Sequence, residues 1–261
     1  MNRRLIAGSL ATLMLALAVT SCGKTTTTAP ATSTPGTVSG NVIVFAASSL
    51  TESFGEIAAV FEKEHPGVTV TVNFGASSAL VKQVQDGAPA DVVAIADTAN
   101  LQKLTDAKLV GEPTIFAKNQ LEIIVPPDNP AGITSLADLA KPGVTVALCA
   151  EQVPCGKFAK QVLATAGLTL TPVTLEENVK GVVTKVTLGE VDAGIVYLTD
   201  VQAAGAKAIG IAIPANQNAV ASYPLAVTTA APNKTAASAF AAFVSSPDGQ
   251  KILGGRGFAA P

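Results

Sequence analysis

The chain has 261 residues, of which 48% are hydrophobic and 14% are charged, so it can bury a large core beneath a lightly charged surface. Its formal net charge of −2 excludes the basic footprint of a nucleic-acid-binding protein. His65 is the only histidine and no CxxC pair occurs, so a zinc or iron site would need carboxylates almost alone. We therefore expect no cation site and no cofactor.

Residues 1–21 have the organisation of a bacterial secretory signal peptide. A short basic region is followed by an apolar run, residues 5–19, that is too short for a comfortable membrane span. The sequence Val19-Thr20-Ser21-Cys22-Gly23 then resembles a lipobox. We expect cleavage before Cys22 and lipidation of Cys22, the alternative being an ordinary signal peptide with an incidental cysteine.

The next segment, residues 22–40, is rich in Thr, Pro, Ser and Ala and has almost no large apolar residue. Such a composition cannot bury enough surface to fold. We interpret it as a tether between the lipid anchor and a folded body. The body would then lie outside the cytoplasm, on the outer face of the cell membrane.

In the first half of the body, apolar runs of strand length alternate with helical patterns. Strands are predicted at residues 42–46, 68–72 and 91–96, and helices at residues 50–64, 79–85 and 101–107. This β-α-β-α-β order predicts a parallel sheet with helices on both faces.

A second set of elements follows a long strand at residues 121–125. Strands are predicted at residues 143–148, 171–175, 193–197, 209–213 and 223–228, and helices at residues 157–166, 179–188, 236–244 and 247–253. Two such sets predict an α/β fold of two lobes, each a mainly parallel sheet flanked by helices. We assign residues 41–122 and 223–261 to one lobe and residues 123–222 to the other. Ligands of open α/β sheets bind beyond the carboxyl ends of the strands, which here is the cleft between the lobes.

Four predicted junctions between a strand and a helix carry small or hydroxyl residues. They lie at residues 47–50, 75–78, 153–156 and 176–179. A helix start offers unpaired backbone N–H groups and about half a positive charge. Several starts aimed at one point make an anion site without a cation. This matters because Arg256 is the only arginine after the signal peptide.

Cys149 and Cys155 lie six positions apart, in a body that we expect outside the cytoplasm. An isolated pair this close favours a disulfide over a redox or metal site.

Six short motifs occur in order along the body. They are Val44-Phe-Ala-Ala-Ser-Ser-Leu-Thr51, Phe74-Gly-Ala-Ser-Ser-Ala-Leu80, Gly87-Ala-Pro-Ala-Asp-Val-Val93, Val153-Pro-Cys-Gly-Lys157, Glu177-Asn-Val-Lys180 and Gly194-Ile-Val-Tyr197. Together they resemble the periplasmic molybdate-binding proteins of ABC importers, which have a type II periplasmic-binding-protein fold. The resemblance covers essentially all of residues 41–261.

The resemblance implies an oxyanion site made of two serines, three backbone N–H positions and a tyrosine. Carried over motif by motif, the site residues are Ser49, Ser77, Cys155, Val179 and Tyr197. Cys155 stands where the family commonly has Ala, a change that is harmless if only the backbone N–H binds. The implied ligand is molybdate or tungstate, and the implied partner is an ABC permease that receives it from a monomeric receptor.

The chemistry of the residues fits this ligand. Molybdate is a dianion whose oxygens only accept hydrogen bonds, so hydroxyl and N–H donors match it. Protonated phosphate would want a carboxylate acceptor, and neither serine turn contains one. Sulfate is the harder rival, because it is also an unprotonated tetrahedral dianion and only cavity size separates the two.

Alternative functions on the same fold are an enzyme or the ligand-sensing domain of a regulator. The lone histidine and the absence of paired carboxylates beside the site argue against an enzyme. The predicted signal peptide argues against a regulator. Taken singly, each serine is also a common helix N-cap, and Tyr197 alone would be interpreted as a residue at the edge of the hydrophobic core.

Overall fold

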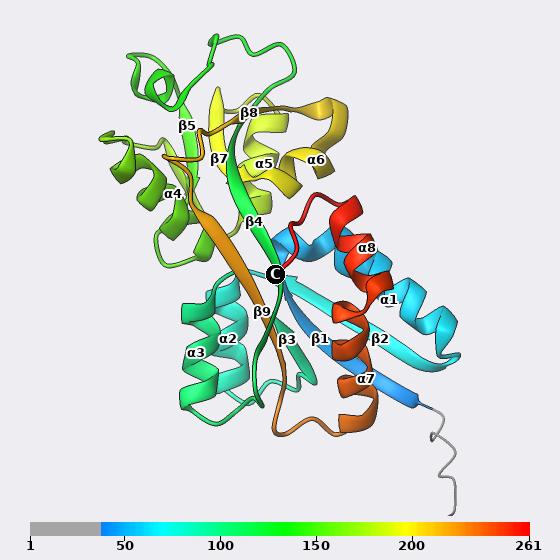
Figure 1. Ribbon diagram of the computed structural model, residues 1–261. Coiled ribbons are helices and arrows are strands. Elements are labelled where there is room, and N and C mark those ends of the chain that lie inside the picture. The colour runs from blue at the N-terminus through cyan, green and yellow to red at the C-terminus, as the bar shows by residue number, and fades with distance from the viewer. Residues whose placement is uncertain (1–37) are drawn as a thin grey trace, which may run out of the picture. The chain divides into compact units, whose positions relative to one another are not determined.

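In the computed structural model, which describes residues 38–261, strands and helices alternate as the sequence predicts (Figure 1). The first set comprises β1 (Ser39–Ala47), β2 (Gly67–Gly75) and β3 (Val92–Ala94), with α1 (Thr51–Glu64), α2 (Ser77–Gln85) and α3 (Thr98–Asp106). A 3₁₀ turn, Ser48–Leu50, joins β1 directly to α1. β1 pairs in parallel with both β2 and β3, as expected for β-α-β units.

The second set repeats this plan. It comprises β5 (Val146–Cys149), β6 (Thr174–Glu176) and β7 (Ala193–Tyr197), with α4 (Pro154–Thr165) and α5 (Val179–Thr187). β5 pairs in parallel with β6 and β7. A short 3₁₀ helix, Leu136–Ala140, precedes the set and is held by a capping box between Ser135 and Asp138.

Two long strands join the two halves and run side by side between them (Figure 1). β4 (Thr114–Val125) pairs with β9 (Val220–Val227) through its first part, and with β7 and β8 (Ile209–Ala212) through its last part. The strand order is β2-β1-β3-β9-β4-β7-β5-β6, with β8 on β4. This is the predicted two-lobed α/β architecture, each lobe having a mainly parallel sheet.

The last two helices, α7 (Lys234–Ser245) and α8 (Pro247–Gly255), pack on the first lobe. Phe54 and Phe61 of α1 meet Phe240 and Phe243 of α7 in a cluster of tilted and edge-on rings. The chain then returns to β4, where Lys118 and Ala259 exchange backbone hydrogen bonds. The C-terminal end is therefore tied to a crossing strand.

The register of the sheets brings the predicted helix starts together. At the carboxyl end of the first lobe's sheet, Ala47 lies beside Gly75 and Ala46 beside Ala94. In the second lobe, Cys149 lies beside Glu176. Each of these strands is followed within a few residues by a helix start, so the starts gather at one edge of each sheet.

The structure differs from the sequence prediction in several elements, among them the unpredicted 3₁₀ helices Leu136–Ala140 and Gly205–Lys207, and three of the differences affect the layout of the fold. β4 begins at Thr114 rather than at residue 121, because its first part is the half that pairs with β9. α6 (Leu198–Ala204) was not predicted, since it follows β7 without a loop and spans too few residues to show a helical period. β1 begins at Ser39, so it includes two residues assigned to the tether.

The predicted signal peptide, the lipidated Cys22 and the tether up to residue 37 lie outside the described residues. Within residues 38–261, no helix is long and apolar enough to cross a membrane. The lobe boundaries at residues 41–122, 123–222 and 223–261 stay a prediction.

Candidate anion-binding site

The five predicted site residues all line one small cavity between the two halves of the fold. The remaining lining residues are Ala47, Ser48, Gly75, Ala76, Ala96, Val153, Pro154 and Asn178. The cavity is nearly filled by its walls: the centre of a water-sized sphere can reach about 10 Å³ of it, which is room for about one water molecule. None of the residues that line it is charged. The structure therefore brings together residues that the sequence had placed in four separate turns and at the end of one strand.

Helix starts supply the backbone donors of this cavity. The residues before α2 and α4 are Ala76 and Val153, which have no polar side chain to cap the first turn. Asn178 caps α5, but its Oδ1 accepts from the N–H groups of Lys180 and Gly181 and leaves out that of Val179. First-turn N–H groups and the positive ends of these helices are thus presented to the cavity.

Both serines are buried, and the oxygen of each has a hydrogen-bond partner in the protein. Ser77 Oγ accepts from the backbone N–H of Ala96 at 3.1 Å. Ser49 Oγ lies 2.9 Å from the hydroxyl of Tyr223, and either atom can be the donor. A serine that accepts from the protein keeps its own proton for a ligand.

Tyr197 contributes a buried hydroxyl at the end of β7. Among the described residues this hydroxyl has no hydrogen-bond partner, although it lies beside that of Tyr223. Burial, followed by the neighbouring Tyr223, Asp200 and Asp97, raises the pKa of Tyr197 well above its ordinary value, so the group stays protonated. A buried donor without an acceptor costs free energy, and its presence in a cavity wall indicates a ligand that accepts.

The Cys149–Cys155 disulfide is present, with 5.8 Å between the two α-carbons. It joins the end of β5 to the first turn of α4. Gly156 is required in the same turn, because a Cβ there would lie 2.1 Å from the carbonyl oxygen of Ala150. The disulfide and the close backbone contact together fix the loop that presents Cys155 to the cavity.

Two lysines of the second half pair with acidic residues of the first half. Lys157 of α4 lies 3.7 Å from Asp97, which caps α3. Lys180 of α5 lies 2.9 Å from Glu52 of α1 and 3.1 Å from Asp200 of α6. The sequence indicated only that these two lysines flank the binding turns, and not that each joins the two halves of the fold.

Asp200 is fully buried beneath the Lys180 pair. Burial raises the pKa of Asp200 to about 6, while Lys180 opposes the rise. Burial alone would lower the pKa of Lys180, but Asp200 and Glu52 together raise it. Asp200 lies in α6, the helix that the sequence did not predict, so no sequence signal pointed to it.

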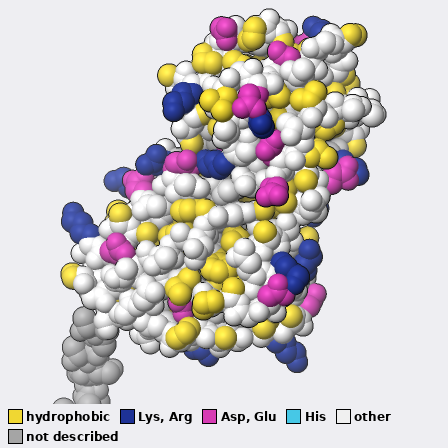
Figure 2. Space-filling view, turned by 180° about the vertical axis from the view of Figure 1, so that it is seen from behind, with side chains coloured by type: hydrophobic (Ala, Val, Ile, Leu, Met, Phe, Trp, Pro, Cys, Tyr) yellow, Lys and Arg dark blue, Asp and Glu magenta, His cyan; other side chains and the backbone are white. Residues whose placement is uncertain are grey.

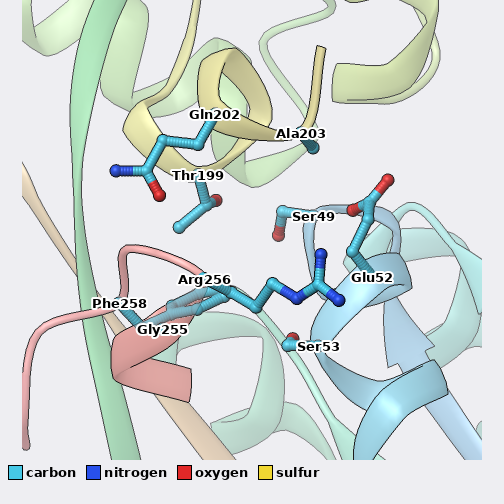
Figure 3. A pocket seen from close by; sticks show the side chains of 9 residues that line it. All are labelled: Ser49, Glu52, Ser53, Thr199, Gln202, Ala203, Gly255, Arg256 and Phe258. Atoms are coloured by element: carbon cyan, nitrogen blue, oxygen red, sulfur yellow. The ribbon is translucent and has the colours of Figure 1, made fainter. Parts of the chain in front are cut away.

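A second cavity shares Ser49 with the first, and Figure 3 shows the side chains that line it. Arg256 extends into it near Ser49, Ser53 and Thr199. The guanidinium is paired with Glu56 at 2.7 and 2.9 Å, so its charge is already balanced. On the face shown in Figure 2, basic and acidic side chains are interspersed.

The family model that matches this chain and the three relatives named below all represent solute-binding proteins. Residues 42–259 match the family model of the bacterial extracellular solute-binding proteins. The chain is 37% identical to the molybdate-binding protein ModA of Mycobacterium tuberculosis over 97% of both chains.

Two solved structures share the fold. The periplasmic molybdate-binding protein of Azotobacter vinelandii is 24% identical, with a TM-score of 0.76 over 84% of this chain and 99% of that one. The sulfate-binding protein SubI of Mycobacterium tuberculosis is 22% identical, with a TM-score of 0.77 over 84% of this chain and 86% of that one. At these identities the structures establish the fold alone.

Proposed function

The chain belongs to the bacterial extracellular solute-binding proteins, and on that premise we propose that it is the molybdate receptor of an ABC importer. The relative from Mycobacterium tuberculosis carries the name of a molybdate-binding protein and matches along almost the whole chain. Members of this family bind solutes and are not enzymes. We propose that the receptor acts as a monomer and delivers its anion to an ABC permease.

One observation carries the proposal: the cavity offers hydrogen-bond donors and no charged side chain. Ser49, Ser77 and Tyr197 each place a buried hydroxyl in its wall. A molybdate oxygen only accepts, and hydrogen bonds to a charged group are roughly twice as strong as neutral ones. The donor set therefore matches an unprotonated oxyanion.

The same donor set disfavours phosphate. Hydrogen phosphate carries a proton at neutral pH, and that proton needs an acceptor. No carboxylate lines the cavity, and those of Glu52, Asp97 and Asp200 are engaged with lysines. A buried donor without an acceptor costs about 1–3 kcal/mol, so hydrogen phosphate would bind more weakly.

Sulfate is the second candidate, because it is also a tetrahedral dianion without a proton. Cavity size has to separate the two anions, because Mo–O bonds are longer than S–O bonds, and the cavity is small. Tungstate has the charge and shape of molybdate, and we propose that it binds in the same way.

We also propose that the mature protein is held at the outer face of the cell membrane through lipidated Cys22. The lipobox-like sequence and the Thr- and Pro-rich segment that follows it support this anchoring. A tether would leave the folded body free to reach its permease.

Isothermal titration of the purified body, residues 38–261, tests the proposed ligand. Molybdate and tungstate should each bind in 1:1 stoichiometry, sulfate should bind more weakly, and phosphate should give no heat of binding. Comparable heats from phosphate and molybdate would show that the donor-only cavity does not select its ligand. Tighter binding of sulfate than of molybdate would make the protein a sulfate receptor.

A further inference from the structure

Tyr223 lies in the crossing strand β9, directly behind the cavity. Its side chain is fully buried, and it is not among the residues that line the cavity. Its hydroxyl lies 2.9 Å from Ser49 Oγ. Two of its neighbours, Ser49 and Tyr197, line the cavity, and Ser49 is the one that shares a hydrogen bond with it, since the Tyr197 hydroxyl has no hydrogen-bond partner among the described residues.

The direction of the Ser49–Tyr223 hydrogen bond decides what Ser49 offers to a ligand. A serine hydroxyl has one proton to donate and two lone pairs. If Ser49 donates to Tyr223, only lone pairs face the cavity, and they repel an oxyanion. If Tyr223 donates to Ser49, the Ser49 proton is left for the ligand.

The surroundings of Tyr223 favour the second direction. Burial raises the pKa of Tyr223, so the phenol always has a proton to give. Asn119, in β4, uses its Oδ1 to accept from the Gln120 N–H and its Nδ2 to donate to Thr199 Oγ1. Both polar groups of Asn119 are thus engaged elsewhere, and the hydrogen bond of the Tyr223 hydroxyl is the one to Ser49 Oγ. A phenol is a stronger donor and a weaker acceptor than an aliphatic hydroxyl, which makes Ser49 Oγ the acceptor.

Ser77 has the same arrangement with a different partner. Its Oγ accepts from the backbone N–H of Ala96, a group that can only donate. The backbone therefore orients Ser77, whereas Ser49 depends on a side chain from the crossing strand. Accepting one hydrogen bond also strengthens the bond that a hydroxyl donates.

We propose that Tyr223 is a positioning residue for the oxyanion: it donates to Ser49 Oγ and so turns the Ser49 proton toward the ligand. This rests on the proposed function, since it needs an acceptor-only ligand in the cavity. It adds a residue that no motif of the sequence singled out, and it connects the site to the strand on which the two lobes would turn.

The test is a double-mutant cycle measured by isothermal titration with molybdate. Tyr223→Phe is made in the parent, in Ser49→Ala and in Ser77→Ala. In the parent and in Ser77→Ala, Tyr223→Phe should lower the affinity about three- to tenfold, the range of one neutral hydrogen bond. In Ser49→Ala it should change the affinity by less than about twofold, because its route to the ligand is gone.

Equal losses in the parent and in the Ser49→Ala background would show that Tyr223 acts structurally, and this would overturn the proposal. So would an unchanged affinity in the parent background. If the parent does not bind molybdate, the proposed function fails instead. The variant keeps the ring that packs on Phe116 and Phe258, and circular dichroism checks its fold.

Neutron diffraction from the molybdate-bound parent gives an answer that needs no variant. A deuteron on the Tyr223 oxygen that points to Ser49 Oγ, with the Ser49 deuteron pointing to the anion, is the expected result. A Ser49 deuteron that points to Tyr223 would overturn the proposal.

Discussion

Ser49 and Ser77 bring the same chemical group to the cavity from neighbouring strands, and each is oriented by a partner behind it. Ser78 follows Ser77 in α2 but does not line the cavity. The three residues therefore provide matched substitutions in which only the position of the lost hydroxyl differs.

Ser49→Ala and Ser77→Ala should each weaken molybdate binding, and Ser78→Ala should not. A hydrogen bond to a charged group is worth roughly 1.5–3 kcal/mol, so each loss should be on the order of tenfold to a hundredfold in affinity. Isothermal titration of the three variants measures this. If Ser49→Ala and Ser77→Ala bound molybdate as tightly as Ser78→Ala, the two predicted serines would not contact the ligand.

At this scale the sequence was informative where a residue acts through its own turn. The serines, Cys155 and Val179 stand at helix starts, and a helix start has a local signature that can be read from the chain. Tyr223 and Asp200 have no such signature. Their roles depend on neighbours more than a hundred residues away, or on a burial that only the folded chain creates.

At the scale of elements, α1, α5 and α6 meet at Glu52, Lys180 and Asp200. Lys180 lies between the two carboxylates, one from each half of the fold. The buried carboxylate of Asp200 destabilises the folded state, because the free energy needed to remove a charge from water exceeds the free energy gained from a single ion pair.

The stability of the folded body should therefore fall as pH rises from about 4 to about 6. Burial raises the pKa of Asp200 to about 6, whereas an unfolded aspartate titrates near 3.8. Between these values the folded state holds a proton that the unfolded state has lost, so the free energy of unfolding declines with pH. Asp200→Asn removes this contribution, which is about 3 kcal/mol at most.

Urea unfolding of the parent and of Asp200→Asn at pH 4 and pH 7 measures the effect. The free energy of unfolding of Asp200→Asn minus that of the parent should be larger at pH 7 than at pH 4. Parallel pH dependences would show that Asp200 titrates alike in the folded and unfolded states.

The hydrophobic periods of the sequence predicted the order of the strands and helices, but they did not predict which strands pair with each other. Alternating strands and helices predicted parallel sheets, and the structure has them. The pairing of the first part of β4 with β9 depends on residues that lie about a hundred positions apart, so no local pattern could reveal it.

On the scale of the whole molecule, the donors come from both halves of the fold. Ser49 and Ser77 follow strands of the first half, and Cys155, Val179 and Tyr197 belong to the second. One anion must recruit both sets to replace its water shell. A ligand that contacts both lobes shifts their equilibrium by its differential affinity for the closed and open states.

Molybdate should therefore reduce the radius of gyration measured by small-angle scattering. The expected hinges are near residues 121–126 and 219–227, where Asn218 exchanges hydrogen bonds with the backbone of Leu121. The Ser49→Ala/Ser77→Ala variant is the control, and its radius should not change at the same molybdate concentration. An unchanged radius in the parent would argue against ligand-driven closure and leave the binding site in place.

The most direct test of the central claim is a crystal structure of the molybdate complex with anomalous data collected at the molybdenum edge. A single anomalous peak should lie in the cavity. From that position the molybdate oxygens should accept hydrogen bonds from Ser49, Ser77 and Tyr197. A peak in the adjoining cavity beside Arg256, or no peak in crystals that contain molybdate, would contradict the assignment of these residues as the site of a molybdate receptor.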